Sequence, residues 1–306
     1  MIRDHKRRSQ GVEEPDLPPN LFVVGLLRDL KEGGYSLRAW GRFWRDSWVR
    51  SVQMIQEHVE LRQSWIGFAL VGATAIITAS LASLRFLPAE EAFWFFLSSL
   101  LWWAVLMTDL GLHLGLMVNL ETGEMERSIG WPNRLTELRG FGAVWVAWGA
   151  HWASSGSYIP LLMVFATAGA SDLLDGWLAR RRHVATRWGR LYDPFMDGLF
   201  FSVAAVSLAK INILPDWLAA LVVFRYAFPI VGAIVFIFVR RRTPRVKHTT
   251  WGRLSSAAIG LMVILAAATN VFQVPVPFLV PAIYAVVCIS MLGALITILM
   301  KGVEQI

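Results

Sequence analysis

The chain of 306 residues has one cysteine, Cys288, and therefore cannot form a disulfide within itself. Cys288 lies in an apolar run, where it is interpreted as a small core residue. Residues 1–10 are polar and basic, but no apolar region of the signal-peptide type follows them, so we expect no cleaved leader. Because the chain has a single cysteine, a fold held together by disulfides is excluded.

Apolar residues are abundant instead. They make up 56% of the chain, the mean hydropathy is +0.50, and there are 15 tryptophans, a residue that favours the bilayer interface. We expect one polytopic all-α membrane helix bundle with eight spans of roughly 18–26 residues, each long enough to cross about 30 Å of hydrocarbon. The expected spans lie near 65–87, 93–118, 138–154, 158–178, 190–210, 216–239, 254–272 and 276–299.

The basic residues indicate the orientation in the membrane. Lysine and arginine gather before the first span and in the loops around 180–190 and 240–253, whereas the opposite side carries only Arg85 and Lys210. Basic loops stay cytoplasmic, so both termini are expected in the cytoplasm, in agreement with the even number of spans. The net charge of +7 suits anionic headgroups and phosphate substrates. Nucleic acid is disfavoured as a partner because the basic residues lie in loops beside apolar spans.

Two segments precede the spans. Residues 9–20 are rich in Pro, Glu and Gln and are predicted to be disordered. A helix is predicted over 35–62, after Gly33 and Gly34, with apolar residues at every third or fourth position and arginines on its other faces. The apolar positions are Leu37, Trp40, Trp44, Trp48, Val52 and Ile55. The pattern favours a helix lying on the cytoplasmic membrane surface, and the alternative is a helix packed on a partner protein.

Four aspartates occur with helical spacing where two apolar segments meet a basic loop. Asp172 and Asp175 share one helical face, and Asp193 and Asp197 share another. Carboxylates in apolar helices are costly and mark functional sites. Because four unpaired charges would repel one another, divalent cations are the natural partner. The alternative is that the carboxylates pair with arginines of the loop.

With its neighbours, this quartet resembles the signature D-x-x-D-G-x-x-A-R, a spacer of about eight residues, then G-x-x-x-D-x-x-x-D of the CDP-alcohol phosphotransferases, integral membrane enzymes of phospholipid synthesis. The fixed positions are all filled, by Asp172, Asp175, Gly176, Ala179, Arg180, Gly189, Asp193 and Asp197. The likeness extends more weakly from about residue 131 to the C-terminus. It implies a six-helix catalytic domain over 131–306, whereas residues 1–120 show no likeness to the family core. For that part, the apolar and amphipathic patterns predict two additional transmembrane helices over 65–120, preceded by a cytoplasmic tail with the interfacial helix over 1–64.

The resemblance also implies a role for each motif residue. The expected metal ligands, holding two Mg²⁺ or Mn²⁺ ions, are Asp172, Asp175, Asp193 and Asp197. Asp197 is also the expected general base. The expected CDP-binding residues are Asn133, Thr136, Asp172, Gly176, Ala179, Arg180 and Gly189. Gly176 and Ala179 leave room for the nucleotide, while Arg180 contacts the CDP phosphates or, as the alternative, anchors its helix at the membrane surface.

The expected acceptor-binding residues are Arg225, Lys247 and Arg253. Their charges could hold the phosphate of a phosphorylated acceptor, and the alternative is that they are solvated or face lipid. The stretch 251–255 is similar to a Gly-Lys-x-Lys-Thr stretch of bacterial phosphatidylglycerophosphate synthases. Two departures leave the acceptor open: Gly198 stands where many of these synthases have Lys, and Tyr226 stands where they have Glu. The acceptor candidates are glycerol 3-phosphate, inositol phosphate, serine and phosphatidylglycerol, with CDP-diacylglycerol as the expected donor.

Two rival functions remain open. Asp109 and His113 form an i, i+4 pair inside the second span, which would suit a proton relay in an ion-coupled transporter, although such a pair is more often a structural contact. The chain could also be a scaffold without catalytic activity. The residues fixed between the aspartates argue against a transporter, and release of CMP separates an enzyme from both rivals. The resemblance further implies a homodimer. We expect it in a bacterial cytoplasmic membrane, in contact with the membrane lipids and with the active site on the cytoplasmic side.

Overall fold

The computed structural model describes residues 21–168, 185–240, 250–272 and 279–303, which are mainly helical. The helices are α1 (Leu21–Glu32), α2 (Leu37–Glu57), α3 (Val59–Ser83), α4 (Ala89–Leu112), the 3₁₀ turn η1 (Leu114–Leu116), α5 (Trp131–Ser154), α7 (Arg187–Lys210), α8 (Asp216–Arg240), α9 (Thr250–Phe272) and α10 (Leu279–Val303). A further helical stretch covers Ile159–Ala168. The described residues contain no strand beyond isolated bridges, so the predicted all-α class is confirmed.

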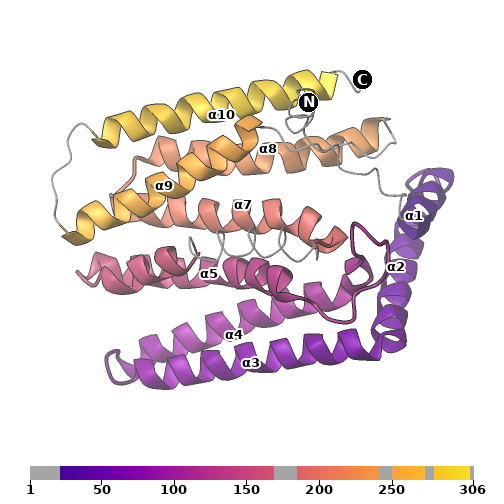
Figure 1. Ribbon diagram of the computed structural model, residues 1–306, viewed down its shortest axis with the longest axis horizontal. Coiled ribbons are helices and arrows are strands. Elements are labelled where there is room, and N and C mark those ends of the chain that lie inside the picture. The colour runs from indigo at the N-terminus through magenta and orange to yellow at the C-terminus, as the bar shows by residue number, and fades with distance from the viewer. Residues whose placement is uncertain (1–20, 169–184, 241–249, 273–278, 304–306) are drawn as a thin grey trace, which may run out of the picture.

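The long helices form a bundle, and α2 crosses one end of it (Figure 1). Helices α3, α4, α5, α7 and α8 run roughly side by side, whereas α1 and α2 lie across the end where α4 finishes and α5 begins. Within the described residues, α3, α4 and α7 are long and apolar enough to cross a membrane. Shorter apolar stretches occur at Ile159–Ala168, Leu254–Thr269 and Pro281–Thr297. The architecture is that of a helical membrane protein.

Each predicted span overlaps a helical segment, but some ends differ. The second span was expected to reach residue 118, whereas α4 ends at Leu112 because His113 leaves helical geometry, with φ −107° and ψ 14°. The chain then passes through η1 toward α7. The fourth predicted span is described only as far as Ala168. The arrangement of six core helices after two additional ones stays a prediction.

The N-terminal helices differ from the single helix predicted over 35–62. Helix α2 ends at Glu57, His58 leaves helical geometry with φ −105° and ψ 77°, and Arg62 belongs to α3. The sequence did not reveal this break because it contains neither glycine nor proline. The predicted start is confirmed, since Gly34 has φ +59° and Ser36 caps α2 by accepting the Ala39 N–H at 3.3 Å. Residues 9–20 lie outside the described ranges.

Helices α5 and α7 pack along each other and lie between two hydrophobic cores. One core, which includes Leu110, Phe141 and Trp188, joins α3 and α4 to α5 and to the start of α7. The other, which includes Phe200 and Ile259, joins the rest of α7 to α8, α9 and α10. Packing on both sides therefore fixes α7, the helix that carries two of the four aspartates.

Tryptophans connect the helices through their indole N–H groups. Trp65 donates to the carbonyl of Met107 at 2.8 Å, and Trp103 donates to the carbonyl of Ala69 at 2.9 Å, which joins α3 to α4. Trp102 donates to the carbonyl of Gly140 at 3.0 Å, which joins α4 to α5. The sequence alone associated tryptophan with the bilayer interface, but these three indoles bond inside the bundle.

Candidate active site

The structure describes one half of the aspartate quartet. Asp193 and Asp197 lie one turn apart on α7. Both follow Gly189, which lies in the first turn of this helix. The residues predicted for the site that lie outside the described ranges are Asp172, Asp175, Gly176, Ala179, Arg180 and Lys247. Arg253 lies in the first turn of α9. The roles of all the predicted site residues stay predictions.

The start of α7 is tied to α5 by a chain of hydrogen bonds. Thr186 caps α7: its hydroxyl oxygen accepts the Gly189 N–H at 3.1 Å and its hydroxyl donates to Asn133 Oδ1 at 3.0 Å. The Asn133 amide nitrogen donates to the carbonyl of Ile129 at 2.6 Å. Asn133, expected to lie near the nucleotide, is buried and holds the cap of α7 in position.

Asp193 is fixed by a second contact with α5. The Thr136 hydroxyl, buried one turn after Pro132, donates to Asp193 Oδ1 at 2.7 Å. Gly189 lets Asn133 approach α7 closely, because a Cβ at position 189 would lie only 2.9 Å from Asn133 Oδ1, whereas Asp193 Oδ2, at 3.8 Å, would be in ordinary contact. The predicted residues Asn133, Thr136, Gly189 and Asp193 therefore lie together at one end of the α5–α7 pair.

We expect Gly189→Ala to lower turnover by roughly 10–100-fold, because Asn133 or the helix must shift to admit the methyl group and supporting contacts at a metal site have effects of about that size. Alanine otherwise favours a helix over glycine by about 1 kcal/mol, so a loss of activity would come from the site. Gly67→Ala is the matched control, since nothing lies within 4 Å of that Cβ in α3. Equal turnover in the two variants would contradict the close approach.

Asp197 forms an ion pair with a residue to which the sequence assigned no role. The Arg139 guanidinium donates to Asp197 Oδ1, and the Arg139 side chain is only 3% exposed against 22% for Asp197. Arg139 lies three residues after Thr136, so the two share a face of α5. That spacing, in the polar first half of α5, was the available signal. Because the sequence does not show that α5 packs against α7, this spacing did not identify Asp197 as the partner of Arg139.

Glu137 is a second charged residue that the sequence analysis passed over. Its side chain is fully buried in α5, and neither carboxylate oxygen has a hydrogen-bond partner among the described residues. A buried carboxylate without a partner is costly and normally takes up a proton. Glu137 therefore differs from Asp193 and Asp197, whose carboxylates are both bonded to side chains of α5.

Arg225 lies at the same side of α7 as Asp197. Its guanidinium donates to Ser255 Oγ at 2.9 Å and to the carbonyl of Gly252 at 3.1 Å, which joins α8 to the start of α9. It also interacts electrostatically with Asp197. One predicted acceptor-binding residue is thus within electrostatic reach of the predicted base.

The described half of the quartet fits a divalent cation. Asp193 and Asp197 present carboxylate oxygens from one helix face, and hard cations such as Mg²⁺ prefer oxygen ligands. Among the residues that the structure describes, no group of three or more His, Cys, Asp or Glu side chains could hold a metal by itself. A complete set of ligands would therefore need carboxylates beyond these two.

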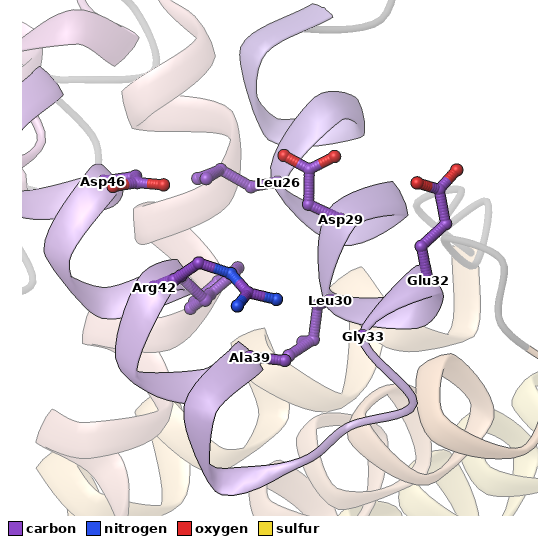
Figure 2. A pocket seen from close by; sticks show the side chains of 9 residues that line it. Leu26, Asp29, Leu30, Glu32, Gly33, Ala39, Arg42 and Asp46 are labelled. Carbon is purple, nitrogen blue, oxygen red and sulfur yellow. The ribbon is translucent and has the colours of Figure 1, made fainter.

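A cavity of about 350 Å³ lies elsewhere, between α1 and α2 (Figure 2). Its lining includes the carboxylates of Asp29, Glu32 and Asp46 and the Arg42 guanidinium, which points into the space between the two helices. None of its lining residues belongs to α5 or α7. The cavity is a feature of the α1–α2 crossing and is separate from the aspartates.

Comparison with known proteins identifies the family. Residues 130–299, more than half of the chain, match the profile of the CDP-alcohol phosphatidyltransferases. The matched region begins at α5 and includes α7, α8 and α9, and with them every residue of the candidate site. The chain belongs to the CDP-alcohol phosphatidyltransferase family, as the aspartate signature predicted.

Individual relatives match over shorter regions. A protein named as a probable cardiolipin synthase (CMP-forming) from Drosophila melanogaster is 32% identical over 123 residues, which are 40% of this chain and 37% of the relative. The chloroplastic CDP-diacylglycerol–glycerol-3-phosphate 3-phosphatidyltransferase 1 of Oryza sativa subsp. japonica is 30% identical over 37% of this chain and 33% of its own. A cardiolipin synthase (CMP-forming) of Streptomyces coelicolor is 43% identical over 70 residues, 23% of this chain and 33% of the relative. The match thus spans about a third of each relative, and no solved structure matches the chain.

Proposed function

We propose that this protein transfers a phosphatidyl group from CDP-diacylglycerol to an acceptor alcohol and releases CMP, as a membrane enzyme of phospholipid synthesis. The observation that carries the proposal is the pairing of Thr136 with Asp193 and of Arg139 with Asp197 between α5 and α7. Both contacts lie inside the region that matches the family. The names of the relatives, which include CMP-forming synthases and a CDP-diacylglycerol-dependent transferase, support the donor.

The reaction exchanges one bond at phosphorus for another. The acceptor hydroxyl oxygen forms a bond to the phosphatidyl phosphorus, the bond from this phosphorus to the bridging pyrophosphate oxygen breaks, and CMP leaves with the electron pair. We assign the hydroxyl proton to the Asp197 carboxylate, acting as general base. The ion pair with Arg139 holds this carboxylate in place and stabilises its charge.

Asp193, together with Asp172 and Asp175, would hold Mg²⁺ or Mn²⁺, with Asp197 next to the second of two ions. When bound, such cations neutralise the pyrophosphate and stabilise the departing CMP. Thr136 fixes one oxygen of Asp193 and so orients the carboxylate. The nucleotide is assigned to the face formed by Gly176, Ala179, Arg180 and Gly189, beside Asn133 and Thr136.

For the acceptor, we propose a phosphorylated alcohol such as glycerol 3-phosphate, held by Arg225 with Lys247 and Arg253. Charge-assisted bonds to phosphate contribute about 1.5–3 kcal/mol, so Arg225→Ala should raise the acceptor KM by roughly 10–150-fold with a smaller effect on the donor KM. Arg225→Lys keeps the positive charge and should raise the acceptor KM less. Arg85→Ala, on an exposed arginine far along the chain from the site, is the control. An unchanged KM in Arg225→Ala would indicate a neutral or lipid acceptor.

We propose that the aspartates lie at the cytoplasmic face of the membrane and that α2 lies on its surface. At about 100° per residue, Leu37, Trp44 and Trp48 project within roughly 20° of Ile55, which packs against the bundle core. Their exposed fractions are 92%, 66% and 57%. The apolar face of α2 is therefore turned toward the bundle. The part of this face that the bundle leaves uncovered would contact the lipid around the bundle. Arg38 and Arg45 project roughly 80–100° away from this face, on one flank of α2, where anionic headgroups would meet them.

This orientation predicts how single cysteines react in intact cells. In a variant with Cys288 replaced, a cysteine in the loops 180–190 or 240–253 should resist a membrane-impermeant thiol reagent, while a cysteine within 212–216 should react. Permeabilised cells, in which all positions should react, are the control. Labelling of the first two loops with protection of 212–216 would invert the proposed orientation.

The function itself is tested with purified protein, CDP-diacylglycerol, Mg²⁺ and a panel of acceptors. We expect CMP and one new phospholipid in equal amounts with one acceptor of the panel, and mass spectrometry identifies the product. An ion-coupled transporter or a scaffold would release no CMP. Size measurement of the same purified sample tests the predicted homodimer.

A further inference from the structure

A polar cluster joins α4, which lies outside the family-matched region, to α7. The His113 Nδ1 atom, at the end of α4, lies 2.8 Å from the Asp109 carbonyl oxygen and 3.2 Å from Asp109 Oδ1. The Tyr192 hydroxyl of α7 lies 3.0 Å from the same His113 Nδ1. Tyr192 immediately precedes Asp193, so the cluster reaches the backbone of a predicted metal ligand.

The hydrogen-bonding capacities of the three groups are mutually consistent. A carbonyl oxygen only accepts, so His113 Nδ1 carries a proton and donates it toward Asp109. The Tyr192 hydroxyl oxygen, 3.0 Å from the protonated Nδ1, is then placed to accept from the same N–H. The Tyr192 ring stacks on Trp188 with ring centres 4.5 Å apart and an interplanar angle of 13°. Trp188 is fully buried in the core shared with α3 and α4. The ring of Tyr192 is therefore fixed by Trp188, and its hydroxyl is fixed by the polar cluster.

The segment after α4 makes a second, independent attachment to α7. The Leu120 N–H donates to the Ala185 carbonyl at 2.8 Å, and the Arg187 N–H donates to the Val118 carbonyl at 2.9 Å. These two backbone bonds flank Thr186, the residue that caps α7 and bonds to Asn133. The segment therefore fixes the entry into α7 through backbone bonds that do not involve α5.

We propose that α4 and the segment 117–120 brace the first two turns of α7, with Asp109, His113 and Tyr192 as positioning residues for the carboxylate of Asp193. This inference rests on the proposed function for its effect on turnover, but the bracing itself does not depend on it. Metal sites respond strongly to residues that orient their ligands, commonly about 10–100-fold in metal affinity or activity. Helix α4, which precedes the family-matched region, is thereby a part of the catalytic unit as well as of the helix bundle.

The test uses the full-length protein and three variants. Tyr192→Phe removes the hydroxyl but keeps the ring on Trp188, His113→Ala removes the donor, and His113→Asn returns a side-chain N–H near the position of Nδ1. Tyr284→Phe, in α10 and beside the far end of α7, is the matched control. Amide hydrogen exchange over 186–196 and the Mg²⁺ concentration for half-maximal CMP release are measured for each variant.

We expect faster exchange over 186–196 in Tyr192→Phe and His113→Ala, with partial recovery in His113→Asn and no change in Tyr284→Phe. The Mg²⁺ requirement should rise roughly 10-fold or more in the first two variants, while saturating Mg²⁺ restores much of the turnover. Wild-type exchange and Mg²⁺ requirement in Tyr192→Phe, the mildest change, would overturn the inference. If the wild type releases no CMP, the proposed function fails, and exchange over 186–196 still decides whether α4 braces α7.

Discussion

Asparagine in place of Asp197 is expected to lower turnover by roughly 10²–10⁴-fold while the affinity for CDP-diacylglycerol changes little. Asn keeps the size of the side chain and can still meet Arg139, but it cannot accept the hydroxyl proton. Removing only the general base leaves donor binding to the rest of the site. The loss should therefore appear in kcat and much less in the donor KM.

The control for this change is Asp216→Asn, which neutralises an exposed aspartate in the first turn of α8 and should keep wild-type rates. Arg139→Gln is an informative second variant. It breaks the ion pair with Asp197 and should lower turnover less than Asp197→Asn, because the base remains. A turnover of Asp197→Asn within a few-fold of the wild type would remove Asp197 from the role of base.

Asparagine in place of Asp193 is expected to abolish metal-dependent turnover, because it removes a carboxylate ligand from a cation that prefers charged oxygen. The same result is expected for Asp172→Asn and Asp175→Asn. Calorimetry with Mg²⁺ measures the loss directly, without reference to turnover. Thr136→Val leaves Asp193 charged but without its hydroxyl donor, so it should weaken Mg²⁺ binding without eliminating it. Undiminished Mg²⁺ binding in all three Asn variants would contradict the assignment of the metal site.

The fold class and much of the candidate site could be predicted because both depend on strong local signals. Apolar runs of membrane length located the helices, and the spacing of Gly189, Asp193 and Asp197 placed them on one face of α7, as the structure has them. The family resemblance assigned Asn133 and Thr136 to the nucleotide, which stays a prediction, and the structure brings them to Thr186 and Asp193 at the start of α7.

The rest depended on helix pairing, which the sequence does not show. Arg139 was visible as one of several charges in the first half of α5, but its partner Asp197 lies 58 residues away. The Asp109–His113 pair was recognised within one helix, whereas Tyr192, 79 residues beyond His113, could not be identified as its partner.

The central claim is that the aspartates of α7 take part in a cation-dependent transfer that releases CMP. Its most direct test is CMP release from CDP-diacylglycerol by the purified protein, first with EDTA and then with increasing Mg²⁺. The account predicts no CMP in EDTA, restored release as Mg²⁺ is added, and one molecule of CMP for each molecule of new phospholipid. CMP release that is unaffected by EDTA, or no release with any acceptor at saturating Mg²⁺, would contradict it.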